Sequence, residues 1–150
     1  MPDQQDADLL LSTHGSDGIL RLTLNDPSRR NALSEAMLGA LSKVFDAAST
    51  NSDIRVIILA AHGPVFCAGH DLKEMTAGRQ NADRGRAYFT KILHQCSSVM
   101  QKIVTCPKPV IAEIDGVATA AGCQLVASCD LAVASETAQF CTPGVHIGLF

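Results

Sequence analysis

The chain has 150 residues, of which 47% are hydrophobic and 18% charged, and its formal net charge is −3. This length and composition predict one soluble domain over residues 1–150, with enough apolar material for a core. The mild acidity and the lack of a basic stripe argue against nucleic acid as a partner. The sequence contains no run of 18 apolar residues, so it predicts no membrane span. The acidic residues 1–8 resemble neither a secretory signal nor a transit peptide, so the default expectation is a cytoplasmic location.

Six cysteines are spread along the chain without a C-x-x-C pair. Several lie in apolar runs, so we expect reduced, buried thiols rather than disulfides or zinc ligands. The sequence has no H-E-x-x-H spacing and no G-x-S-x-G turn, so it carries no signature of a metalloprotease or a serine hydrolase. The cysteines are Cys67, Cys96, Cys106, Cys123, Cys129 and Cys141.

Strand and helix patterns alternate in the first part of the chain. Residues 9–14 and 19–24 read as strands joined by a short turn, which predicts a hairpin. Ser34 is a typical cap for the helix that follows. The β-branched run 54–60 predicts a strand covered on both faces. The apolar face expected for the helix consists of Met37, Leu38, Leu41, Val44, Phe45 and Ala48.

The rest of the chain continues this rhythm. Residues 78–85 are polar and expected to be mobile, and a long helix follows them, ended by Pro107 and Pro109. The run 109–115 predicts a buried strand, and the later elements are a short helix and two strands. The pattern predicts an α/β fold with helices flanking a sheet. The apolar side of the long helix should contain Phe89, Leu93, Cys96, Met100 and Ile103; the later elements are expected at 125–129, 130–134 and 139–141.

Two stretches of small residues, 62–75 and 116–124, each lead from a strand into a helix. Main-chain N–H groups at a helix start favour negative charge, and small side chains let a ligand oxygen approach them. If two such donors meet at one carbonyl oxygen, they stabilise an enolate or oxyanion. Close packing of helix on strand explains the small residues equally well at this point. The apolar residues 145–150 are unusual for a terminus, so we expect an incomplete chain whose remainder covers this face.

Three segments together resemble the enoyl-CoA hydratase/isomerase (crotonase) superfamily, in that family's order and spacing. They are Arg30–Ser34, Phe66–Glu74 and Ile114–Leu125. The likeness spans about residues 9–150 and is greatest to the branch called enoyl-CoA hydratase domain-containing protein three. It implies a crotonase-like spiral of ββα units whose C-terminal helices, which complete the site and build trimers, are missing from this chain. It also implies a homotrimer or a dimer of trimers.

The resemblance implies binding of acyl-CoA thioesters of the kind used in fatty-acid metabolism. In the family, two main-chain N–H groups hold the thioester oxygen, and these map to His70 and Ala121. Cationic side chains suit the phosphates of CoA. Coenzyme A is part of the substrate, so no separate cofactor and no metal is implied. The residues that would border the CoA are Arg29, Arg30, Ala68, His70, Asp71, Leu72, Lys73 and Ala121.

The two glutamates with which the hydratases add water are both replaced, by Gln124 and Gly144. Glutamine has no usable proton-transfer pKa and glycine has no side chain. Their loss should remove on the order of 10² to 10⁴-fold of the rate, so ordinary hydratase activity is doubtful. The imidazole of His70 titrates near neutral pH and could take over proton transfer, although the family uses only the backbone there. The other titratable candidates, whose directions the sequence does not fix, are His94, Glu113, Asp115, Cys123 and His146.

Two hypotheses therefore stand beside each other. One is an enzyme of the hydratase/isomerase family that stabilises a thioester enolate without the glutamate pair. The other is a catalytically silent protein that binds acyl-CoA. A third and weaker idea is that the chain is only a subunit-interaction piece.

Overall fold

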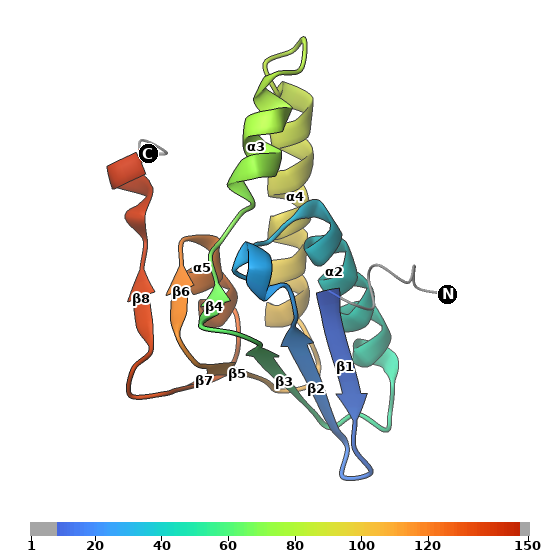
Figure 1. Ribbon diagram of the computed structural model, residues 1–150. Coiled ribbons are helices and arrows are strands. Elements are labelled where there is room, and N and C mark those ends of the chain that lie inside the picture. The colour runs from blue at the N-terminus through green and yellow to red at the C-terminus, as the bar shows by residue number, and fades with distance from the viewer. Residues whose placement is uncertain (1–8, 148–150) are drawn as a thin grey trace.

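Strands and helices alternate along the chain in the computed structural model, which describes residues 9–147 (Figure 1). The expectations for residues 1–8 and for residues 148–150 lie outside that part. The strands are β1 (Leu10–His14), β2 (Ile19–Leu24), β3 (Val56–Ala61), β4 (Val65–Cys67), β5 (Val110–Ile114), β6 (Val117–Thr119), β7 (Leu131–Ala134) and β8 (Gln139–Cys141). The helices are α2 (Glu35–Thr50), α3 (Leu72–Arg79), α4 (Arg86–Val104) and α5 (Ala121–Ala127), with short 3-10 turns η1 (Pro27–Arg29) and η2 (Pro143–Ile147).

The strands form two sheets rather than the single sheet that the sequence suggested. In the larger sheet the order is β1-β2-β3-β5-β7, and only the expected β1–β2 hairpin is antiparallel. The smaller sheet is parallel with the order β4-β6-β8. The strands β4 and β6 lie inside the two stretches of small residues. Sequence reasoning missed these two short strands, which show no alternating pattern, although it predicted the equally short β8 at 139–141.

The core lies between the larger sheet and the helices α2 and α4. Alternate residues of β2, namely Leu20, Leu22 and Leu24, are buried toward it, as a period of two requires. The hydroxyl of Ser34 accepts a hydrogen bond from the Met37 N–H at 3.1 Å, which confirms the expected cap of α2. The largest fully buried side chains of the two helices are Met37, Leu38, Leu41, Phe45, Ile92 and Ile103.

The opposite face of the larger sheet is more exposed than expected. Val56 and Ile58 are only half-buried, which contradicts a strand covered on both faces. This face instead carries the ion pair of Arg21 with Glu113, whose side chains are 40% and 49% exposed. The described residues therefore cover this face of β3 only in part.

Three other expectations need correction. Leu93 is 54% exposed instead of lying on the apolar side of α4. Helix α3 continues to Arg79, so the start of the segment 78–85 is helical rather than loop. Helix α5 begins at Ala121, four residues before its expected start. Ala120, which directly precedes the helix, has a non-helical backbone conformation with φ 52°.

The strands β7 and β8 lie at edges of the two sheets, and all their residues are exposed. Leu131 and Val133 are each 62% exposed and Phe140 is 51% exposed. Among residues 9–147, no helix combines the length and the apolar character that crossing a bilayer requires.

Candidate functional site

The segments that carry the resemblance are adjacent in space. The Ala68 N–H donates to the Arg30 carbonyl at 3.1 Å, and the Leu33 N–H donates to the Gly69 carbonyl at 2.8 Å. These two bonds tie the loop before α2 to the turn between β4 and α3, as in a short parallel pairing. The first two segments therefore form one structural unit.

The turn between β4 and α3 also packs against the start of α5. A Cβ atom on Gly69 would lie 3.1 Å from the Ala120 Cβ and 3.2 Å from the Ala121 nitrogen. A Cβ on Gly122 would overlap the carbonyl oxygen of Cys67. The close approach excludes a side chain at Gly122, and at Gly69 the tight contacts and the φ of 84° both favour glycine. The two stretches of small residues thus meet at one place.

Two main-chain N–H groups at this meeting point are uncommitted. The hydrogen bonds found within residues 9–147 include no acceptor for the N–H of His70 or for that of Ala121. Ala121 is the first residue of α5, where the helix itself offers its N–H no partner. Both groups are therefore available to a ligand oxygen.

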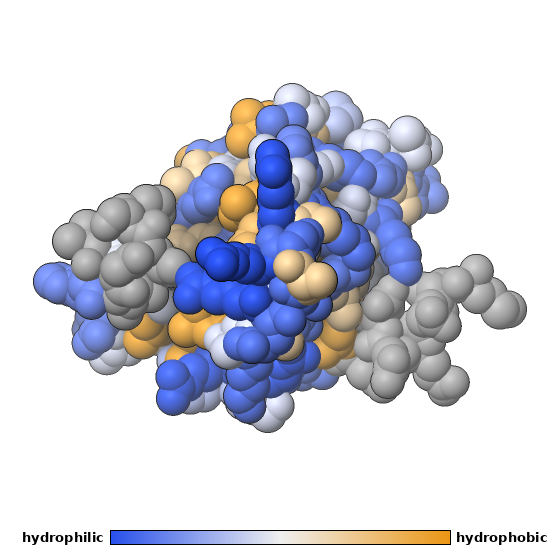
Figure 2. Space-filling view, turned by 90° about the horizontal axis from the view of Figure 1, so that it is seen from above, coloured by the Kyte–Doolittle hydropathy of each residue, from blue (hydrophilic) through white to orange (hydrophobic). Residues whose placement is uncertain are grey.

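A hollow of about 410 Å³ lies beside the first of these amides. Seven of the eight residues expected to border CoA line it, and the exception is Ala121. Figure 2 looks down on the end of the molecule where α3 and α4 project, and hydrophilic residues dominate that face. The lining residues are Ser28, Arg29, Arg30, Ala32, Ala68, His70, Asp71, Leu72 and Lys73.

Charged side chains at the hollow form a network of ion pairs. Arg29 forms an ion pair with Asp71, in which Nε at 2.9 Å and Nη2 both donate to Oδ2, and its Nη2 also donates to Glu74 Oε1 at 3.2 Å. The bond to Asp71 is the largest of the effects that raise the pKa of Arg29. Burial alone would raise the pKa of Asp71, but hydrogen bonds from the Glu74 N–H and from Arg29 outweigh it and hold that pKa below its usual value.

Asp71 also caps α3. Its Oδ1 accepts from the N–H groups of Lys73 at 2.8 Å and Glu74 at 3.1 Å, which satisfies two donors at the helix start. The side chain is 5% exposed, so it needs these partners to remain ionised. The position of α3 therefore depends on this carboxylate.

Asn31 is a second buried polar anchor, with no exposed surface. Its Oδ1 accepts from the Asp26 N–H at 2.8 Å, and its Nδ2 donates to the carbonyls of His62 and Val65 at 2.8 Å and 2.7 Å. It joins the loop before α2 to the connection between β3 and β4. Sequence reasoning did not assign roles to Asn31, Asp26 or Glu74. The spacing Asp71-x-x-Glu74 fits a capping box and could have indicated Glu74.

Unusual backbone angles concentrate around the site. Arg30 and Asn31 have φ values of 57° and 50°, and Gly69 has 84°. Ala120, with φ 52° and ψ −121°, is the most unusual because its ψ lies outside the left-handed helical region. Such conformations cost on the order of 1–3 kcal/mol each and persist where the surrounding structure enforces them.

The imidazole of His70 is partly enclosed. Its Nδ1 is buried and has no hydrogen-bond partner among the described residues. Burial lowers the pKa of His70 below 6.5, and the nearby Leu33 carbonyl opposes this only in part. The ring is therefore largely neutral at pH 7.

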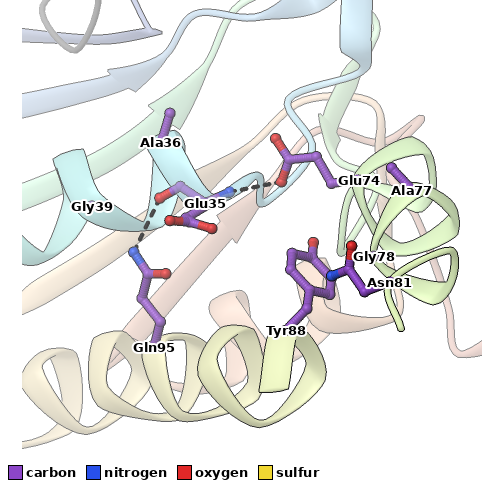
Figure 3. Close-up of a pocket in the computed structure, with 9 residues that line it drawn as sticks. All are labelled: Glu35, Ala36, Gly39, Glu74, Ala77, Gly78, Asn81, Tyr88 and Gln95. Carbon is purple, nitrogen blue, oxygen red and sulfur yellow. Dashed lines mark hydrogen bonds between the residues drawn. The ribbon is translucent and has the colours of Figure 1, made fainter. Parts of the chain in front are cut away.

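A second hollow, of about 730 Å³, lies between α2, α3 and α4 (Figure 3). Glu74 separates the two hollows, because its Oε1 bonds Arg29 and its Oε2 accepts the Glu35 N–H at 2.9 Å. Gln95 approaches from α4 and donates to the Glu35 carbonyl at 3.0 Å. The carboxylate of Glu35 also pairs with Lys91.

The positions of the replaced glutamates do not line the 410 Å³ hollow. Gln124 is exposed on α5, and Gly144 is buried in η2. The Ala120 N–H donates to the Cys141 carbonyl at 2.9 Å, so β8, which precedes η2, runs beside the start of α5. The segment with Gly144 therefore begins close to the second uncommitted amide.

The remaining titratable candidates are exposed or engaged elsewhere. His94, Asp115 and His146 are exposed, and Glu113 pairs with Arg21. The Cys123 thiol is half-buried and donates to the Ala118 carbonyl at 3.0 Å, which supports a structural role.

The cysteines are all free, but Cys141 is exposed, which corrects the expectation that all would be buried. Burial raises the pKa of Cys67 and that of Cys129 to about 12, so neither is a ready nucleophile. Within residues 9–147, no three His, Cys, Asp or Glu residues are grouped to hold a metal ion.

Solved structures with the same fold include an enoyl-CoA hydratase from Mycobacterium smegmatis, with a TM-score of 0.87 and 49% identity over 95% of this chain and 53% of that one. Human enoyl-CoA hydratase domain-containing protein 3 gives a TM-score of 0.84 and 46% identity over 93% of this chain and 53% of its own. The architecture is therefore the crotonase-like fold that the sequence predicted.

The family model for enoyl-CoA hydratase/isomerase matches residues 14–150, and the chain belongs to this family. It is 51% identical over 141 residues to enoyl-CoA hydratase domain-containing protein 3, mitochondrial, of Rattus norvegicus, covering 94% of this chain and 45% of that protein. It is 35% identical over 135 residues to 2,3-dehydroadipyl-CoA hydratase of Escherichia coli, covering 87% of this chain and 48% of that protein. The chain spans about half the length of the curated relatives it matches.

The expectation of a cytoplasmic location is wrong. The relatives at about 50% identity, from rat, mouse and human among others, are all named mitochondrial. Reasoning from the composition of residues 1–8 alone gave the incorrect default.

Proposed function

We propose that the protein binds acyl-CoA thioesters, with the CoA moiety in the 410 Å³ hollow and the thioester oxygen between the N–H groups of His70 and Ala121. The observation that supports this proposal is the close approach of Gly69, the residue before His70, to the amide nitrogen of Ala121, together with the lack of an acceptor for either N–H among the described residues. Paired main-chain donors stabilise the negative charge that develops on a thioester oxygen as an enolate forms.

The charges of the hollow favour a phosphorylated ligand. Arg30 and Lys73 line it without a carboxylate partner among the described residues, and guanidinium and ammonium groups bind phosphate oxygens strongly. The E. coli relative is named for a CoA thioester, which agrees with this substrate class. Such chemistry needs no separate cofactor, because coenzyme A is itself part of the substrate.

The reaction itself is limited by the residues at the two glutamate positions. Exposed Gln124 and buried Gly144 offer no carboxylate for adding water. These residues support either enolate chemistry with another proton carrier or a silent acyl-CoA-binding protein of fatty-acid-type metabolism. We also propose a mitochondrial location and, from the family resemblance, a homotrimer or dimer of trimers.

Calorimetric titration with butyryl-CoA, paired with a hydration assay on crotonyl-CoA, tests the proposal. We expect binding of butyryl-CoA and hydration well below that of a family enzyme with both glutamates. No binding would refute the proposed function, and hydration at the full rate would refute the interpretation of Gln124 and Gly144.

A further inference from the structure

The three cations of the hollow are not equivalent. Arg29 is engaged by Asp71 and Glu74, and its Nε also lies 3.8 Å from Asp26. In contrast, no carboxylate among residues 9–147 pairs with Arg30 or Lys73, and both side chains are exposed at the hollow. The positive charge of Arg29 is therefore balanced within the protein, and the other two charges are not.

The carboxylates around Arg29 each hold the start of a helix or turn. Asp26 caps η1 by accepting the Arg29 N–H, and Asp71 caps α3. Glu74 accepts the N–H of Glu35, the first residue of α2, as Figure 3 shows. A single guanidinium thus connects η1 and the start of α3, which line the hollow, with the start of α2.

A phosphate that recruited Arg29 would have to separate it from Asp71. The Asp71 side chain is 5% exposed, and leaving a buried carboxylate without its partner carries a large desolvation cost. Arg30 and Lys73 can bind a phosphate without breaking any ion pair. Their charges therefore remain fully available to an anionic ligand.

Resting on the proposed binding of acyl-CoA, we propose that Arg30 and Lys73 recognise the phosphates of the ligand, whereas Arg29 is a positioning residue that fixes the hollow and the His70 amide. Arg29 and Arg30 are neighbours of the same type, yet the first acts through protein carboxylates and the second on the ligand.

Two ligands with the same acyl thioester separate these roles, namely butyryl-CoA and butyryl-pantetheine, which lacks the phosphates and the nucleotide. Losing a hydrogen bond to a charged group weakens binding by about tenfold or more. Arg30→Gln and Lys73→Gln should therefore each lower the affinity for butyryl-CoA by that factor. In both variants the affinity for butyryl-pantetheine should stay within about twofold of that of the unchanged protein. Arg29→Gln should lower the affinity for both ligands by the same factor. Arg86→Gln, at a residue outside the hollow, is the control for the change in net charge.

Ionic strength gives a second measurement that needs only butyryl-CoA. Salt screens the attraction of exposed charges for phosphate, so the salt dependence of the dissociation constant should become weaker in Arg30→Gln and Lys73→Gln but not in Arg29→Gln. Arg30→Lys should keep most of the affinity, because a point charge suffices for phosphate. Arg29→Lys should not, because one ammonium cannot hold Asp71 and Glu74 in the same fork.

The possible failures are distinguishable. If Arg29→Gln, or Arg29→Lys should the first not fold, weakens butyryl-CoA alone and reduces its salt dependence, Arg29 is a phosphate ligand and the inference is overturned. It is equally overturned if Arg30→Gln and Lys73→Gln affect both ligands alike. If the unchanged protein binds neither ligand, the proposed function itself fails.

Discussion

Gly69 packs closely against the amide nitrogen of Ala121. A Cβ at Gly69 would stand 3.2 Å from that nitrogen and 3.1 Å from the Thr119 carbonyl oxygen. The contact joins two turns that are far apart in the sequence. It makes the geometry of the proposed oxyanion site a property of backbone packing rather than of any catalytic side chain.

We expect Gly69→Ala to reduce the recognition of the thioester oxygen. The new methyl group must displace the start of α5 by a few tenths of an ångström, and φ 84° is unfavourable for alanine by about 1–2 kcal/mol. The preference for butyryl-CoA over the thioether S-butyl-CoA, which lacks the carbonyl oxygen, should fall by about tenfold for two weakened hydrogen bonds. Competitive calorimetry with the two ligands measures this ratio.

Gly39→Ala provides the matched control. A Cβ there would meet only the Gln95 Nε2 at 3.7 Å, which is an ordinary contact. Because alanine favours the helix, this variant should gain up to about 1 kcal/mol of stability with an unchanged ligand preference. An unchanged preference in Gly69→Ala as well would contradict the role of the contact.

A second prediction concerns the packing of α5 on β4. In Gly122→Ala the added Cβ would overlap the Cys67 carbonyl oxygen and stand 2.9 Å from the carbonyl carbon. Backbone atoms cannot rotate away, so the free energy of unfolding should fall by about 1–3 kcal/mol. Helix propensity alone predicts the opposite sign, a gain of about 1 kcal/mol. Urea unfolding decides between the two signs.

Cys67→Ala offers an internal check on this explanation. It shortens the side chain but leaves the carbonyl oxygen in place, so the double variant Cys67→Ala/Gly122→Ala should remain less stable than Cys67→Ala alone. Recovery of stability in the double variant would mean that the thiol side chain, not the backbone, opposes the methyl group.

The sequence was sufficient for those features that depend on periodicity and on short-range capping. The β1–β2 hairpin follows from alternation, and the start of α2 follows from Ser34. Of the smaller sheet, only β8 was predicted, at 139–141. The strands β4 and β6 have three residues each and lie within stretches of small residues, where no alternating pattern marks a strand.

The lining of the hollow was predicted from motif resemblance, and the division of its charges was not. Nothing in the order Ser28-Arg29-Arg30 tells which arginine pairs with Asp71. That depends on the turn η1 and on Arg30 having φ 57°, which are tertiary properties. Leu93 was wrongly placed in the core because the buried stripe of α4 passes through Ile92 and Cys96, and Leu93 lies beside that stripe on the exposed side of the helix.

We expect Asn31→Ala to destabilise the fold by about 2–4 kcal/mol, because it leaves the Asp26 N–H and the carbonyls of His62 and Val65 without partners in a buried region. Asn31→Asp has nearly the same shape but cannot donate to the carbonyls, so it should be no better at pH 7. Thermal unfolding measures both. Asn81→Ala, at an exposed residue, should stay within about 0.5 kcal/mol.

The last prediction uses the pH dependence of the Asp71 carboxylate. Its pKa in the folded protein lies below the usual value of 3.8, so the folded state favours the charged form. The resulting stability is complete above the pKa of the unfolded chain and is lost as the pH falls through that value toward the lower, folded pKa. Asp71→Asn keeps a weaker cap but removes the charge, so it should cost about 2–4 kcal/mol at pH 7.

The stability difference between Asp71→Asn and the unchanged protein should therefore shrink as the pH is lowered from 7 to about 3. Chemical unfolding at a series of pH values measures this difference. Glu113→Gln provides a comparison, because its pKa is also lowered, by the bond from Arg21, but its side chain is 49% exposed and the pair should contribute only about 0–1 kcal/mol. A difference for Asp71→Asn that stays constant over this range would mean that the carboxylate acts through its shape and not through its charge.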